Sequence, residues 1–212
     1  MIGGLLILGF STAAWAADPP TVGAEGGLNI NTASFSGTDA QGINPGTKAG
    51  FAIGGFVGIP VSPMFAIMPE VLYEQKSVSL TGSGNATGYT ANLKYDVVEI
   101  PVLVKIDLAR MKSPGYYVVA GPGFAFATTV KLTDQKAGSQ TLPDEDLKAT
   151  NQVQNTDYTI VVGFGVTKGP LGIEARYDAG LRNINKESAG EDFKVHSRVF
   201  SILGRYSFNL KK

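Results

Sequence analysis

The amino-acid sequence predicts an all-β protein, an eight-stranded antiparallel up-and-down transmembrane β-barrel. The strongest observation is an alternation of apolar and polar side chains in residues 171–182, where Ile173 and Tyr177 alternate with Glu174 and Arg176. Only a β-strand places two such sets on opposite faces. Eight segments with strand character can be marked, and the connections between them are alternately short and long. Eight is the smallest common strand number of membrane barrels.

The expected strands cover residues 21–31, 48–60, 64–79, 89–106, 116–130, 156–167, 171–182 and 196–210. Short connections with Pro or Gly occupy residues 59–63, 107–115 and 168–170. Longer polar connections occupy residues 31–47, 80–88, 131–155 and 183–195. Short turns at one rim and long loops at the other are typical of a barrel with periplasmic turns and extracellular loops.

Several strands repeat the alternation of residues 171–182. In residues 64–79, Phe65 and Val71 face away from Glu70, and in residues 89–106, Ile100 faces away from Glu99. The last strand places Phe200, Ile202, Tyr206 and Phe208 opposite Ser201, Arg205 and Ser207, with Leu203 as an exception. Aromatic residues near strand ends favour belts at the two membrane interfaces. They are Tyr73, Tyr116, Tyr206 and Phe208.

Residue size and charge indicate which face points inward. The alternation alone also fits a soluble periplasmic ligand-binding barrel, in which the apolar face lines a cavity. The polar faces carry many glycines and alanines, such as Gly121, Gly123 and Ala125, which suit a narrow lumen. On a lipid face, Arg or Lys would cost about 2–4 kcal/mol at the midplane. We therefore expect an ion network inside the lumen, formed by Glu70, Glu99, Lys105, Glu174, Arg176, Asp178 and Arg205.

Residues 1–16 predict a secretory signal peptide. The segment from Met1 to Phe10 is apolar, and Ala14-Trp15-Ala16 has the small-x-small form of a cleavage site. The apolar stretch is shorter than the roughly 20 residues of a spanning helix. Cleavage after Ala16 would leave residues 17–212 as one barrel domain, exported to the cell outer membrane of a Gram-negative bacterium.

Composition excludes several classes of partner and cofactor. Lys plus Arg equals Asp plus Glu at 18 each, so no net field recruits nucleic acid. The chain has no cysteine, which removes disulfides, thiolate catalysis and cysteine-bound metals. We expect outer-membrane lipids and lipopolysaccharide around the wall, and a surface or secretion partner at the long loops.

Catalytic and metal chemistry find little support. A hydrolase would need His196 beside a serine, but Ser197 faces the opposite side of the strand and no Gly-x-Ser-x-Gly segment occurs. Ser201 or a loop serine would be required, so a membrane-embedded lipid hydrolase remains an alternative. Asp144-Glu145-Asp146 lacks the spacing of a calcium loop. We expect no catalytic residue, no cofactor and no metal, and a structural, adhesive or secretion-assisting protein.

The order of short motifs resembles the PorT-like outer-membrane β-barrel proteins. These motifs are Gly27-Leu28-Asn29, Gly50-Phe51 with Gly55, Pro69-Glu70-Val71-Leu72-Tyr73, the segment from Val98 to Lys105, Gly121-Pro122, Glu174-Ala175-Arg176-Tyr177 and the segment from Gly180 to Ile184. The resemblance implies an outer-membrane barrel of this size, and most members of that group have no assigned activity. The chain departs from the group's usual aromatic ending, since Asn209-Leu210-Lys211-Lys212 follows Phe208.

Overall fold

The computed structural model describes residues 19–36, 42–83, 87–108, 113–150, 153–183 and 194–209. The eight long strands are β1 (Thr21–Ser36), β3 (Lys48–Pro60), β4 (Phe65–Gly82), β5 (Tyr89–Asp107), β6 (Gly115–Ala137), β9 (Thr156–Lys168), β10 (Leu171–Gly180) and β11 (Lys194–Asn209). Three short strands lie in the long connections: β2 (Ile43–Pro45), β7 (Gln140–Thr141) and β8 (Glu145–Asp146). The expected signal peptide, residues 1–16, lies outside the described residues.

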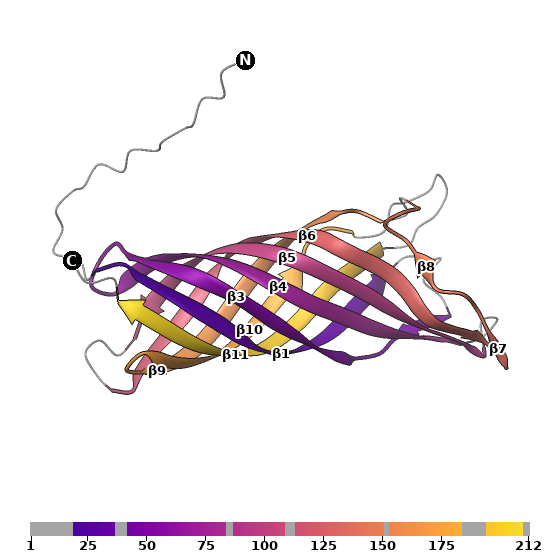
Figure 1. The fold of residues 1–212 in the computed structure, drawn as a ribbon, viewed down its shortest axis with the longest axis horizontal. Coiled ribbons are helices and arrows are strands. Elements are labelled where there is room, and N and C mark those ends of the chain that lie inside the picture. Colours follow the sequence, from indigo (N-terminus) through magenta and orange to yellow (C-terminus); the bar gives the residue numbers. More distant parts are fainter. Residues whose placement is uncertain are drawn as a thin grey trace, which may run out of the picture.

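The long strands form a closed antiparallel ring (Figure 1). Strand β1 pairs with β3 on one side and with the last strand, β11, on the other. The partners Thr21 and Asn209 bring the start of β1 and the end of β11 to the same rim. The eight-stranded antiparallel barrel predicted from the sequence is therefore confirmed. Within the described parts of the chain, no helix is long and apolar enough to cross a membrane.

The outer face of the barrel is apolar and the inner face is charged. Ile173 is 64 % exposed and Leu28 is 71 % exposed, whereas Glu174 is fully buried and Arg176 is 1 % exposed. The predicted orientation is thus confirmed. A water-soluble barrel would not leave a continuous belt of large aliphatic and aromatic side chains on its surface, so that alternative is wrong for this part of the wall.

Aromatic side chains gather toward both ends of this apolar belt. Near the short turns, Tyr116 stacks on Phe164 with ring centroids 6.2 Å apart, and Tyr206 packs against Phe208 at 4.6 Å. Phe51–Tyr73 and Phe124–Tyr158 form two further pairs toward the loop rim, at 6.0 and 5.6 Å. Contrary to the expectation, Tyr73 does not lie near a strand end, because β4 continues to Gly82.

Beyond the apolar belt, the strands continue with their two faces exchanged. The outward positions of β4 are apolar from Phe65 to Tyr73 and polar from Gln75 onward, while its inward positions become apolar at Val78 and Leu80. We call the part beyond the belt the loop-side extension. It comprises residues 32–36, 75–82, 89–96, 128–137 and 194–198. With a rise of about 3.3 Å per residue and a tilt near 40°, eight residues project roughly 20 Å beyond the belt.

The sheet of the extension contains irregularities that re-aim its side chains. The pairing of β5 with β6 shifts between Asp96 and Val97, and the hydroxyl of Thr128 there donates to the carbonyl oxygen of Asp96 at 3.0 Å. This β-bulge changes which residues of β6 point inward. Before it, the odd-numbered residues Ala125 and Ala127 are buried, and after it the even-numbered Val130 is buried. The apolar interior of the extension therefore continues past the bulge.

The inward glycines allow the narrow barrel to close, and Gly27 gives a direct test. A Cβ atom on Gly27 would overlap the carbonyl oxygen of Ile202 in the neighbouring strand. We expect Gly27→Ala to lower the free energy of unfolding by about 1–3 kcal/mol, since the backbone of β11 must move. Urea titration in lipid vesicles measures this. Gly204→Ala is the control, because its Cβ would meet only the carbonyl oxygen of Gly26 at 3.6 Å. Equal losses in both variants would contradict the packing argument.

Candidate functional site

The barrel interior is layered along its axis, and β4 contributes to every layer. From the short-turn end, its inward side chains alternate between apolar packing and ion pairs before becoming apolar at the loop end. They are Met68, Glu70, Leu72, Glu74, Lys76, Val78 and Leu80, all buried. The layers from Glu70 to Lys76 therefore fill the middle of the lumen.

The first charged layer, here called the Arg176 cluster, contains two guanidinium groups and three carboxylates. Arg176 forms ion pairs with Glu70 at 2.8 Å and with Glu174 at 2.6 Å. Arg205 pairs with Glu25 at 3.1 Å, with Glu70 at 2.9 Å and also with Glu174. These residues come from β1, β4, β10 and β11, so the cluster links strands across the lumen.

The second charged layer, the Lys76 cluster, lies nearer the loops. The ammonium group of Lys76 is 2.7 Å from Glu74 and 3.3 Å from Glu99. The hydroxyl of Thr159 donates to the other oxygen of Glu99 at 2.5 Å. Asp178 is buried too, and its carboxylate oxygens have no hydrogen-bond partner among the described residues.

The structure divides the seven residues that the sequence suggests for a lumenal network. Glu70, Glu174, Arg176 and Arg205 meet in the Arg176 cluster, Glu99 belongs to the Lys76 cluster, and Asp178 lies on the inner face. Lys105 does not join either cluster, contrary to the expectation. It pairs with Asp107 at 2.9 Å near the short turns, and its ammonium group lies 4.8 Å from the ring centre of Tyr117.

Three charged members of these clusters are missing from the sequence-based set, although the same alternation identifies them. Glu74 and Lys76 continue the inward series of Glu70 in β4, and Glu25 occupies the inward series of β1 between glycines. A strict count of every second residue along both strands would have found all three.

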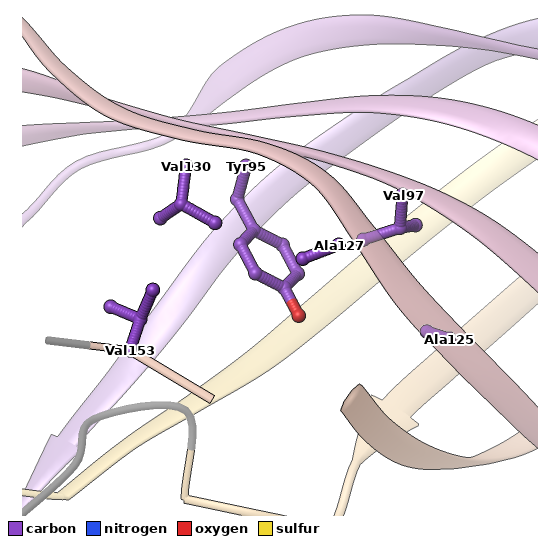
Figure 2. Packing of buried hydrophobic residues seen from close by; sticks show 6 residues of the cluster. All are labelled: Tyr95, Val97, Ala125, Ala127, Val130 and Val153. Carbon is purple, nitrogen blue, oxygen red and sulfur yellow. The ribbon is translucent and has the colours of Figure 1, made fainter. Parts of the chain in front are cut away.

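Two cavities flank the charged layers. The turn-side cavity has a volume of about 250 Å³, and Lys105, Tyr117 and Arg205 are among its lining residues. The loop-side cavity, of about 230 Å³, lies inside the extension and is lined mainly by apolar side chains. Figure 2 shows one wall of this region, where Tyr95, Val130 and Val153 lie close together. The Arg176 and Lys76 clusters lie between the two cavities.

Among the described residues, those considered for catalysis and metal binding do not assemble into a site. Strand β11 places His196 on the outer face and Ser201, 1 % exposed, on the inner face, so the imidazole cannot reach that hydroxyl. Asp146 accepts the backbone N–H groups of Lys148 and Ala149 at 3.1 and 3.0 Å. The bond from Ala149 contributes most to holding the pKa of Asp146 below its usual value. In the described segments, no three His, Cys, Asp or Glu residues group as metal ligands.

Comparison with solved structures finds small outer-membrane proteins of low identity. OprG from Pseudomonas aeruginosa is 10 % identical, with a TM-score of 0.49, over 91 % of this chain and 97 % of that one. Neisserial surface protein A is 18 % identical, with a TM-score of 0.45, over 91 % and 99 %. Ail of Yersinia pestis is 12 % identical, with a TM-score of 0.43, over 90 % and 99 %.

A family model matches this chain over most of its length, whereas the similarities to solved structures are weak. No curated protein matches the sequence. The family described as "Outer membrane protein beta-barrel domain" matches residues 19–186, which is most of the chain and includes all or part of every strand from β1 to β10. The chain therefore belongs to this family of outer-membrane β-barrel proteins.

Proposed function

We propose that the protein is a non-conducting, non-enzymatic barrel that anchors an interaction surface outside the cell, with a structural, adhesive or secretion-assisting role. The observation that carries this proposal is the combination of a lumen filled by two ion clusters with an extension whose outer face is polar. Outer-membrane lipids and lipopolysaccharide would surround the belt, and a surface or secretion partner would bind at the loop rim. The motif order supports a place among the PorT-like proteins of Gram-negative bacteria within this family.

The filled lumen leads to a first test. The Arg176 cluster joins side chains from four strands. The buried apolar residues Phe56, Leu103 and Tyr117 pack on the side of this cluster that faces the short turns. In planar bilayers, we expect no large, steady single-channel currents from the purified protein, because the charged layers leave no wide aqueous path. Steady currents of the size given by general diffusion pores would contradict the proposal.

The interaction role needs a test in cells. Thr90 and Lys136 are cross-strand partners on the exposed face of the extension. In a deletion strain, we expect Thr90→Glu with Lys136→Glu to restore cell adhesion or protein secretion less well than the wild-type gene. Lys168→Glu at the short-turn rim is the matched control and should restore both. If deletion of the gene changes neither adhesion nor secretion, the proposed role is wrong.

A further inference from the structure

The loop-side cavity is apolar in a part of the protein that stands beyond the membrane belt. Its walls come from β1, β4, β5, β6 and β11 together with the connection between β6 and β9. Val130 and Val199 are each 1 % exposed and Val78 is 8 % exposed, so these walls are built from well-buried side chains. The valine and leucine side chains of these walls offer water none of the two to four polar partners that hold it, so this part of the cavity favours hydrocarbon.

Two buried polar atoms interrupt this apolar lining. Tyr95 is 6 % exposed and Asn31 is 1 % exposed, and both line the cavity. The hydroxyl of Tyr95 and the side-chain oxygen of Asn31 have no hydrogen-bond partner among the residues that the structure describes. Figure 2 shows the Tyr95 ring extending from its strand with the hydroxyl at its far end, directed into the interior. Buried polar groups normally find a partner, so the cavity lacks one polar group at this position.

The charges below the cavity decide between a neutral and an anionic occupant. Lys76 lines the cavity, but Glu74 and Glu99 already pair with its ammonium group. The buried side chains of the described residues include eight carboxylates (Glu25, Glu70, Glu74, Asp96, Glu99, Asp157, Glu174 and Asp178) against three cations (Lys76, Arg176 and Arg205). A carboxylate would therefore enter an apolar space above an excess of acidic groups, which is unfavourable.

We propose that the loop-side cavity is a binding site for a small neutral amphiphile that has a hydrocarbon body and one hydroxyl group. A cavity of 150 Å³ binds benzene in another protein, so 230 Å³ fits about nine non-hydrogen atoms, the size of an eight-carbon alcohol. The hydrocarbon contacts the valine and leucine walls, and the hydroxyl pairs with Tyr95, which can both donate and accept. This site is independent of the adhesive or secretory role proposed above.

Nuclear magnetic resonance can detect such binding directly. The probes are 1-octanol, octane and octanoate, added to the methyl-labelled protein in nanodiscs of deuterated lipid. We expect 1-octanol to give saturable shifts, and nuclear Overhauser contacts, at the methyl groups of Val153 and Val195, which line the cavity. The lipid-facing methyl groups of Val102, 40 % exposed, should shift only in proportion to the alcohol dissolved in the lipid. Octanoate should give no saturable shift.

Three variants separate the cavity from the lipid and the hydroxyl from the hydrocarbon. Val130→Phe fills the cavity and should remove the saturable shifts, whereas Val102→Phe on the lipid face should leave them unchanged. Tyr95→Phe keeps the cavity shape and should reduce the preference for octanol over octane roughly fivefold, the value of one neutral hydrogen bond. A shift of gel mobility on heating verifies that each variant is folded.

Three results would overturn the proposal. Shifts at Val153 and Val195 that stay linear with octanol would show that the cavity takes up no ligand. Saturation that survives in a folded Val130→Phe variant would place the ligand elsewhere. An unchanged octanol preference in Tyr95→Phe, the variant least able to disturb folding, would remove Tyr95 as the polar anchor.

Discussion

Replacement of Arg176 by Met is expected to lower the free energy of unfolding by about 3–5 kcal/mol, because it leaves the carboxylates of a buried ion cluster without one of their two cations. Arg176 is 1 % exposed and pairs with Glu70 and Glu174. After the change, only Arg205 would neutralise these two groups and Glu25. The folded fraction across a urea gradient in lipid vesicles, read from the gel mobility of unheated samples, measures the loss.

Two further variants show whether the loss comes from the cluster. Arg198→Met removes an exposed arginine on the outer face of β11 and should change the free energy by less than about 0.5 kcal/mol. The double variant Arg176→Met with Glu70→Gln should cost less than the sum of its single changes, because the two residues share one ion pair. Strictly additive losses would mean that the pair contributes no coupling energy.

Replacement of Ile173 by Arg is the second change with a large expected effect. Ile173 is 64 % exposed in the apolar belt of β10, between Leu171 and Tyr177. An arginine there must place its guanidinium among acyl chains, which costs about 2–4 kcal/mol near the midplane and less toward the interfaces. The same urea titration in lipid vesicles measures the loss.

Gln75→Arg is the matched control for this change. Gln75 also points outward, but it is the first polar position of β4 beyond the belt, so an arginine there stays in water. We expect a change within about 0.5 kcal/mol. Similar costs at positions 75 and 173 would show that the belt does not coincide with the hydrocarbon core.

The part of the fold inside the belt could be predicted because its outward side chains are apolar throughout. The strand expected over residues 48–60 agrees with the observed β3, and the alternation predicts the last strand despite Leu203. Leu203 points inward and packs with Ala52 and Leu72. This apolar residue interrupts the polar inner face of β11 because it belongs to an apolar layer between the two charged layers. Packing across the lumen was the missing information, which no single strand contains.

Several strands extend further beyond the belt than the sequence predicts, for a different reason. In residues 131–137 the outward side chains are polar and a bulge interrupts the period, so the segment has the composition of a loop. The pairing of β6 with β5 forms a sheet there nevertheless. The partner of Lys105 could not be found either, because it depends on where the short turn places Asp107.

The exchange of faces along the strands of the loop-side extension also fixes how deep the molecule sits. Moving the barrel by one residue pair, roughly 5 Å along the membrane normal, would draw Gln75 and Arg198 among the lipid tails in one direction. In the other direction it would lift Phe51 and Tyr158, on the loop side of the belt, into the aqueous phase. Both displacements are opposed, so a bilayer of unsuitable thickness must stretch or thin around the protein rather than let it slide.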